Sequence, residues 1–207
     1  MAPVTGHNPV RAALGIPLEE ILVLYAGNLG RKQGLETLLD AAALLGHGIH
    51  VAVVGDGAER EALVDRAKTI GATHVRFLPL VSEADLPALL SAGDIHVITQ
   101  KAAAAELVLP SKILNIMAAA KPVVVTAEAG TALAEVVVGA ECGLVVDPDA
   151  PMALAGAIRI LEGDAQARRR MGDNGRRYVV LTFSRDAVLR RLEILLRWMI
   201  SCSRGAR

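Results

Sequence analysis

The sequence has few cysteines, few aromatic residues and no net charge. Only Cys142 and Cys202 occur among its 207 residues, far apart and in no metal-ligand spacing, which excludes a disulfide framework and a cysteine zinc site. The five histidines form no H-x-x-H or H-E-x-x-H pattern. Because 22 basic side chains balance 22 acidic ones, no overall positive field attracts nucleic acid. We therefore expect a reduced, cytoplasmic protein with no metal and no nucleic-acid partner.

Long hydrophobic runs are also missing. No segment reaches the ~18 uninterrupted apolar residues of a membrane span, and residues 1–19 lack the apolar core of a signal peptide. Residues 188–200 carry an apolar stripe with arginines opposite. That pattern is typical of a helix that docks on protein, and contact with the inner face of a membrane remains an alternative.

Six short apolar runs predict the fold. Each is bounded by Gly, Pro or Asp and rich in β-branched residues, at 21–27, 49–55, 74–80, 94–99, 122–126 and 143–147. Stretches with helical periodicity lie between them. This alternation predicts an α/β fold, a doubly wound six-stranded parallel Rossmann-like sheet with helices on both faces.

No Ser-rich or Pro-rich linker interrupts the six units. We expect residues 1–19 to be a lead-in segment, residues 20–162 a single Rossmann-like domain, and residues 163–207 a C-terminal helical tail.

Ligands of such sheets bind at the carboxyl ends of the strands, so residues directly after the strands are candidates. The first run leads into "GNLGRKQG" (27–34), where glycine amides could approach a phosphate and Arg31 and Lys32 add charge. A tight turn with two surface cations explains the same residues. Gly55 and Gly57 keep the second strand end open. The spacing is neither G-x-G-x-x-G nor G-x-x-x-x-G-K-[ST], which disfavours dinucleotide and NTPase sites.

The third candidate is "LPSKILNIMAAAKPVVV" (109–125). Ser111 after Pro110 is a plausible N-cap, and the apolar residues then fall on one side of a helix. Lys112 and Asn115 share the other side, which suits a phosphate and a sugar hydroxyl. An ordinary capped, half-exposed helix is the alternative.

Together these segments resemble the C-terminal, donor-binding half of the GT-B glycosyltransferases of the group-1, retaining type. The resemblance rests on "YAGNLGRKQGLETLLDAA" (25–42), "VVGDGAERE" (53–61), "VRFLPLVSEADLPALLSAGDIHVI" (75–98), "LPSKILNIMAAAKPVVVT" (109–126) and "CGLVVDPDAPMALAGAI" (142–158). The segments run in the family order over roughly residues 20–195. Their variants are similar to those of enzymes that build bacterial surface polysaccharides.

The resemblance implies a nucleotide-diphosphate sugar as donor substrate, with UDP as the expected nucleotide and no metal cofactor. It implies catalytic roles for Glu106, near the donor sugar, and for Lys112. The implied donor-binding residues are Gly30, Arg31, Lys32, Ser111 and Lys112 at the diphosphate, Asn115 at the ribose, the backbone of Phe77, Leu78, Pro79 and Leu80 at the base, and Gly27, Asn28, Gly55 and Pro110 around them.

Several positions depart from the family pattern. Asn28 and Gln33 stand where the family's phosphate-binding arginine and lysine are usual, Ala120 stands where glycine is usual, and Glu106 is displaced by one position.

A complete enzyme of this type also has an acceptor-binding half, which we expect in cis or in trans. The chain is then part of a longer transferase, the partner of a separate acceptor half, or a module without catalysis. A non-catalytic nucleotide-sugar-binding or assembly module and a nicotinamide-dependent oxidoreductase domain are the competing hypotheses. Self-association through the C-terminal stripe is expected where no partner covers it.

Overall fold

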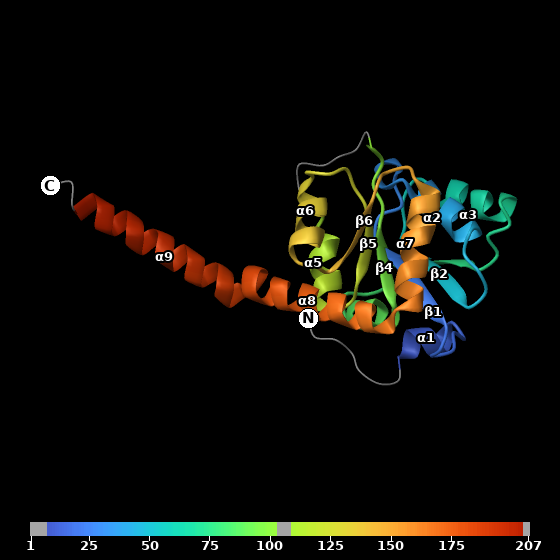
Figure 1. Cartoon of the computed structure of the whole chain (residues 1–207), viewed down its shortest axis with the longest axis horizontal. Coiled ribbons are helices and arrows are strands. Elements are labelled where there is room, and N and C mark those ends of the chain that lie inside the picture. The colour runs from blue at the N-terminus through green and yellow to red at the C-terminus, as the bar shows by residue number, and fades with distance from the viewer. Residues whose placement is uncertain (1–7, 103–108, 205–207) are drawn as a thin grey trace.

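The computed structural model describes residues 8–102 and 109–204, and its centre is one parallel sheet (Figure 1). Six strands pair in the order β3-β2-β1-β4-β5-β6, and every pairing is parallel. The strands are β1 (Ile21–Ala26), β2 (Ile49–Val54), β3 (Val75–Leu78), β4 (Ile95–Ile98), β5 (Val123–Thr126) and β6 (Gly143–Val146). The predicted doubly wound, Rossmann-like sheet is confirmed.

Each predicted run contains a strand, but the strands are shorter than the runs. The run at 74–80 loses most, because β3 ends at Leu78 and Pro79 follows, which has no amide hydrogen for the ladder. The central strands β1, β4 and β5 are buried almost throughout. Aliphatic, β-branched runs form such strands because both of their faces meet helices.

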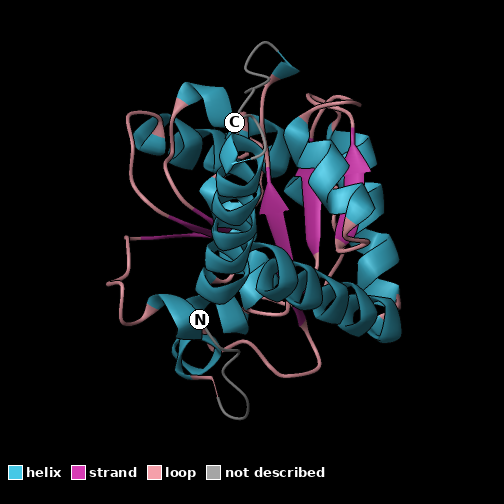
Figure 2. Ribbon diagram, turned by 90° about the vertical axis from the view of Figure 1, so that its left-hand side faces the viewer, coloured by secondary structure: helices cyan, strands magenta, loops and turns pink. Residues whose placement is uncertain are grey.

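Helices cover both faces of the sheet (Figure 2). One face packs against α2, α3 and α7, and the other against α1, α4, α5 and α6. The helices up to this point are α1 (Pro9–Ala13), α2 (Leu35–Ala43), α3 (Arg60–Thr69), α4 (Leu86–Ala92), α5 (Ser111–Ala118), α6 (Ala132–Gly139) and α7 (Pro151–Gly163), with a short 3-10 turn η1 (Arg31–Gln33) before α2.

Two further helices follow the sheet. α8 (Ala165–Phe183) packs on the body, and the absence of side chains at Gly172 and Gly175 allows this. A Cβ atom on Gly172 would lie 2.2 Å from the carbonyl oxygen of Ala120. α9 (Arg185–Arg204) projects away from the sheet (Figure 1). Within the described residues no helix is long and apolar enough to cross a membrane. The division of the chain at residues 19 and 162 stays a prediction.

The start of α5 corrects one prediction from the sequence. Ser111 is not the N-cap: Pro110 occupies that position with extended φ −61° and ψ 125°, and Ser111 is the first helical residue. The extended ψ of Pro110 keeps this residue outside the helix, so helical geometry begins one residue later. The capping position makes no side-chain hydrogen bond to the helix.

Candidate functional site

A pocket opens where the strand order reverses. β1 neighbours β2 on one side and β4 on the other, so the helices that follow these strands diverge to opposite faces and leave a crevice at the carboxyl ends. The pocket has a volume of about 380 Å³, and its lining comes from the ends of β1 and β2, the loop after β3, α4 and the start of α5. The lining residues are Ala26, Gly27, Val54, Leu80, Val81, Ser82, Glu83, Leu86, Leu89, Ser111, Lys112 and Asn115.

Lys112 and the turn after β1 face each other in this pocket. A Cβ atom on Gly27 would lie 2.9 Å from Lys112 Nζ, so the ammonium group rests directly against the turn. Ser111 and Asn115, exposed on the same helix, line the pocket beside it. The structure therefore brings together the two segments that the sequence singled out separately.

Tyr25 holds Lys112 in place. Lys112 Nζ donates a hydrogen bond of 3.1 Å to the Tyr25 hydroxyl and lies 4.4 Å from the centre of its ring. The hydroxyl in turn donates to the carbonyl of Asn28 at 2.7 Å. Burial raises the pKa of Tyr25 well above its usual range, so the phenol stays neutral. One neutral side chain thus connects β1, the 27–34 turn and α5.

Sequence reasoning missed Tyr25. It occupies the fifth position of a strand whose first five residues are all buried, where an aromatic residue is normally a packing residue. The one available signal was a hydroxyl-bearing residue in an otherwise aliphatic strand, directly before the glycine turn.

The glycines of the first two turns serve backbone packing. A Cβ atom on Gly55 would lie 1.9 Å from the carbonyl oxygen of Gly27, and one on Gly57 would lie 2.5 Å from that of Leu29. The amide of Gly27 already donates to Val54 O at 2.9 Å, and that of Leu29 donates to Asp56 O at 2.9 Å. These two amides are therefore held by the neighbouring turn and are not available to a phosphate.

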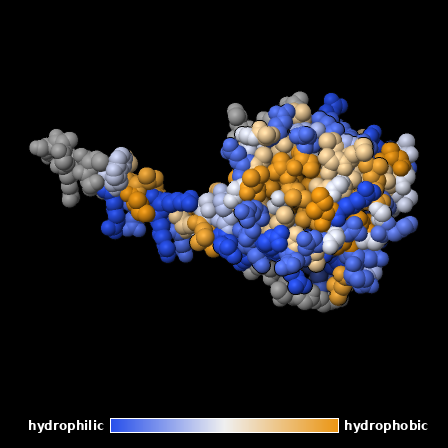
Figure 3. Space-filling model, viewed as in Figure 1, coloured by the Kyte–Doolittle hydropathy of each residue, from blue (hydrophilic) through white to orange (hydrophobic). Residues whose placement is uncertain are grey.

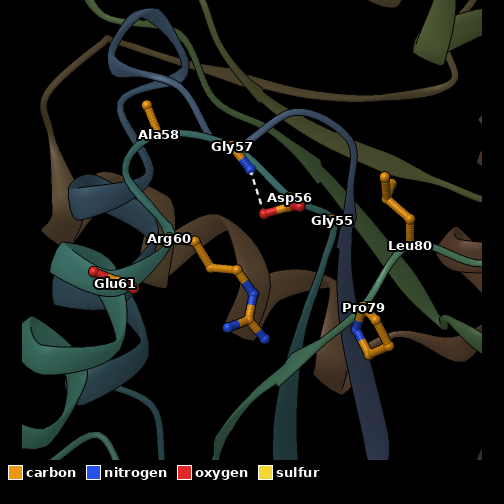
Figure 4. Close-up of a pocket in the computed structure, with 8 residues that line it drawn as sticks. All are labelled: Gly55, Asp56, Gly57, Ala58, Arg60, Glu61, Pro79 and Leu80. Carbon is orange, nitrogen blue, oxygen red and sulfur yellow. Dashed lines mark hydrogen bonds between the residues drawn. The ribbon is translucent and has the colours of Figure 1, made fainter.

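A second pocket of about 750 Å³ lies beside the first, beyond β2 and β3 (Figure 4). Arg60 extends into the space between Asp56 and Pro79, and Leu80 lines both pockets. The lining residues are Gly55, Asp56, Gly57, Ala58, Arg60, Glu61, Pro79 and Leu80. Sequence reasoning had not selected Arg60 or Glu61 for the site.

The predicted base-binding residues divide into two groups. Pro79 and Leu80 are exposed and line the second pocket. Phe77 and Leu78 belong to the β2–β3 ladder, paired with Val53 and Val54. The structure thus places the loop after β3 at the pockets and keeps the strand itself in the sheet.

Of the two cations predicted in the 27–34 turn, Lys32 lies near Lys112 and Arg31 does not line the pocket. Lys32 lines a small cavity of about 50 Å³ that Lys112 and Pro110 share, so these two cations lie close together. Arg31 is 87% exposed, and its Nε lies 3.1 Å from a carboxylate oxygen of Glu59. Asn28 turns toward Gly57 of the neighbouring loop. Glu106 lies outside the described residues.

The site is suited to an anion. Lys112 and the start of α5, an eight-residue helix, line the crevice, and Lys32 lines the small cavity that shares Lys112 with it. A helix N-terminus carries a partial positive charge. Among the described residues no group of three His, Cys, Asp or Glu side chains could hold a metal ion. The expectation that no metal is required stays a prediction.

The fold and the crevice define a doubly wound α/β domain with a lysine-lined pocket at its switch point. Residues 8–178 match the family described as "Glycosyl transferases group 1", and the chain belongs to this family. Its fold is the Rossmann-like half of the GT-B glycosyltransferases. This membership favours a transferase over the nicotinamide-dependent oxidoreductase.

Known proteins share this half. A putative colanic acid biosynthesis glycosyl transferase, WcaI of Escherichia coli K12, is 37% identical over 183 residues, covering 87% of this chain and 44% of its own length. Sucrose-phosphate synthase from Thermosynechococcus elongatus superposes with a TM-score of 0.80 at 27% identity, over 98% of this chain and 50% of that one. Anabaena HepE in complex with UDP superposes with a TM-score of 0.79 at 25% identity, over 91% of this chain and 51% of the HepE chain. The chain spans about half the length of the curated relatives that it matches.

Proposed function

We propose that this chain is the donor-binding half of a retaining glycosyltransferase, which takes a UDP-sugar and passes the sugar to a lipid-linked or polysaccharide acceptor. The observation that carries the proposal is the position of Lys112, whose ammonium group lies in the switch-point crevice against the turn after β1. HepE, a structural neighbour, has been solved with UDP, and the WcaI relative is named for polysaccharide synthesis. Both support this donor and this class of product.

The two adjoining pockets suit an extended donor. The diphosphate lies against Lys112 and the start of α5, the ribose near Asn115, and the base near Pro79 and Leu80, where the pockets meet. When the bond between the sugar and the diphosphate breaks, negative charge develops on the departing phosphate. A fixed ammonium group and helix amides stabilise that charge as it forms.

Catalysis also requires an aligned acceptor. Binding one substrate does not position the second, so the contribution of proximity and orientation to the rate depends on an acceptor-binding half. We propose that such a half completes the site, in cis or in trans, at the open side of the crevice. Cytoplasmic location, with contact at the inner membrane face, stays a prediction.

UDP is expected to stabilise the fold. At a concentration one hundred times its dissociation constant, a ligand of the native state adds about 2.7 kcal/mol to the free energy of unfolding, which raises the Tm of a domain of this size by about 5–10 °C. Differential scanning fluorimetry with UDP, GDP, ADP and uridine measures this. Uridine serves as control because it lacks the diphosphate. Equal shifts with UDP and uridine would contradict the proposed function.

A non-catalytic binding or assembly module is the second candidate. The observation that favours it is the crevice itself, whose described lining accounts for binding of a donor without alignment of an acceptor. Such a module would bind UDP normally. It would neither transfer nor hydrolyse the donor sugar after an acceptor-binding half is added.

We also propose that α9 is the surface that packs on the acceptor-binding half. The helix projects from the body, and Figure 3 shows hydrophobic and charged side chains along it. Its large apolar side chains are between 49% and 66% exposed, at Val188, Leu189, Leu192, Ile194, Leu195, Leu196, Trp198 and Met199. A contiguous stripe of this kind is typical of an interaction surface.

Without that partner, this stripe is expected to cause self-association. Sedimentation velocity at rising concentration should show oligomers of the wild-type chain and a monomer for the double variant Leu192→Glu, Leu196→Glu. Arg190→Glu, a change of charge on the opposite side of the helix, should still associate. A wild-type chain that stays monomeric throughout, or that floats with anionic vesicles instead, would overturn this prediction.

A further inference from the structure

A further polar cavity, separate from the two pockets of the donor site, lies at the amino ends of the strands. It has a volume of about 320 Å³, and its lining residues are Leu18, Asp94, Ala120, Lys121, Pro122, Ala165, Arg168 and Arg169. Leu18, Asp94 and Pro122 precede β1, β4 and β5, whereas the donor pocket follows the strands. Since β1 has six residues at about 3.3 Å each, roughly 20 Å separate the two sites.

Positive charge dominates this cavity. Lys121, Arg168 and Arg169 line it, and Asp94 is the one carboxylate among its described lining residues. That carboxylate is already occupied, because Asp94 Oδ2 accepts from Arg11 Nη1 at 2.6 Å and from the amide of Leu22 at 2.9 Å. The cavity therefore holds more cationic than anionic groups.

Lys121 is the central cation. Its side chain is half-buried, and among the described residues its Nζ makes no recorded hydrogen bond or ion pair. Burial lowers the pKa of Lys121, Asp94 opposes this, and Arg11 and Arg168 lower it further. Burying an ammonium group beside other cations is unfavourable unless water or an anion stabilises it.

The surrounding backbone makes this a fixed site. Ala120 adopts a left-handed conformation with φ 55°, which ends α5 and directs Lys121 into the cavity. α8 holds this turn closely, as the contact of Gly172 with the Ala120 carbonyl shows. Arg168 donates from Nη1 to the carbonyl of Glu162 at 2.6 Å, so its guanidinium group is anchored at the end of α7.

We propose that this cavity binds a phosphoryl group, as inorganic phosphate or on a small sugar phosphate. Ammonium and guanidinium donors together match the charge and the several acceptor oxygens of a phosphoryl group. The volume stands at the lower end of the range for small-molecule sites, which suits these ligands better than a nucleotide sugar. α5 carries Lys112 at its start and leads into Lys121 at its end, so one helix joins this site to the donor pocket.

Isothermal titration calorimetry with the Lys112→Gln variant tests the proposal, since that substitution is expected to weaken phosphate binding at the donor pocket. Inorganic phosphate and glucose 6-phosphate are titrated separately, and the tighter ligand identifies the source. Arg169→Gln, added to that background, should weaken binding about tenfold, the effect of one charge-assisted hydrogen bond. Lys121→Gln should do the same. Arg169 is exposed, so its replacement leaves folding intact.

Arg170→Gln is the matched control. It removes the same charge from the next residue, which is exposed and lies outside the cavity lining. The Lys112→Gln, Arg170→Gln double variant should bind the phosphoryl ligand with the same affinity as the Lys112→Gln variant alone. Absence of saturable binding in that background, or equal weakening by Arg169→Gln and Arg170→Gln, would overturn the second site and leave the proposed donor function unaffected.

Discussion

Replacing Gly55 with alanine is expected to lower the free energy of unfolding by at least about 3 kcal/mol. The new Cβ atom would lie 1.9 Å from the carbonyl oxygen of Gly27, which is backbone and cannot turn aside. Gly55 also has φ +153°, a conformation that side chains disfavour. The turns after β1 and β2 must therefore move apart, and this movement breaks the 2.9 Å hydrogen bond from Gly27 N to Val54 O.

Gly156→Ala is the control for this substitution. Gly156 lies inside α7, and a Cβ atom there meets nothing within 4 Å. The same chemical change should therefore raise the free energy of unfolding by roughly 0.5–1 kcal/mol, because alanine has the higher helix propensity. Urea denaturation followed by circular dichroism measures both variants. Equal stability of Gly55→Ala and wild type would show that the two turns do not interlock as described.

The fold was predictable because its signals are local. Each of the six strands lies in a short, mainly aliphatic run bounded on at least one side by glycine, proline or aspartate, and the alternation with helices leaves few arrangements. The exact strand ends were less predictable, since they depend on where pairing partners stop. The prediction that Ser111 caps α5 was wrong. Ser111 has a side chain typical of the capping position, but the extended conformation of Pro110 makes Pro110 the cap and Ser111 the first helical residue.

Part of the site followed from the same logic. Gly27 comes directly after β1, and Lys112 lies at the start of α5, the helix that follows β4, so the parallel sheet brings both to the carboxyl ends of its strands. The close packing of Gly55 and Gly57 and the role of Tyr25 could not be predicted from the sequence. Both depend on tertiary contacts between the turns and α5, and the sequence does not give the distances between these segments. Arg31 was expected at the phosphate for its charge alone, and the structure pairs it with Glu59.

Lys112→Gln is expected to weaken UDP binding at least about thirtyfold, which corresponds to ~2 kcal/mol for a charge-assisted hydrogen bond. The ammonium group lies directly against Gly27 at the start of the turn after β1, and glutamine fills similar volume without the charge. Uridine, which has no diphosphate, should bind the variant and the wild type equally. Calorimetry with both ligands separates loss of the charge from damage to the pocket.

Tyr25→Phe tests whether positioning of this lysine matters as much as its charge. The variant keeps the ring beneath Lys112 Nζ but removes the hydroxyl that accepts the 3.1 Å hydrogen bond. UDP affinity should fall about three- to tenfold, the net effect of one hydrogen bond, and uridine affinity should stay unchanged. In the Lys112→Gln background the same change should have little further effect on UDP, since the group to be positioned is gone.

This double-mutant comparison separates two accounts of Tyr25. If its hydroxyl only stabilised the 27–34 turn through the Asn28 carbonyl, Tyr25→Phe would weaken UDP binding by the same factor in the wild-type protein and in the Lys112→Gln variant. If it orients the ammonium group, the two substitutions are not additive. Additive losses would show that Tyr25 does not orient Lys112, and its hydroxyl would then act on UDP binding through the 27–34 turn alone.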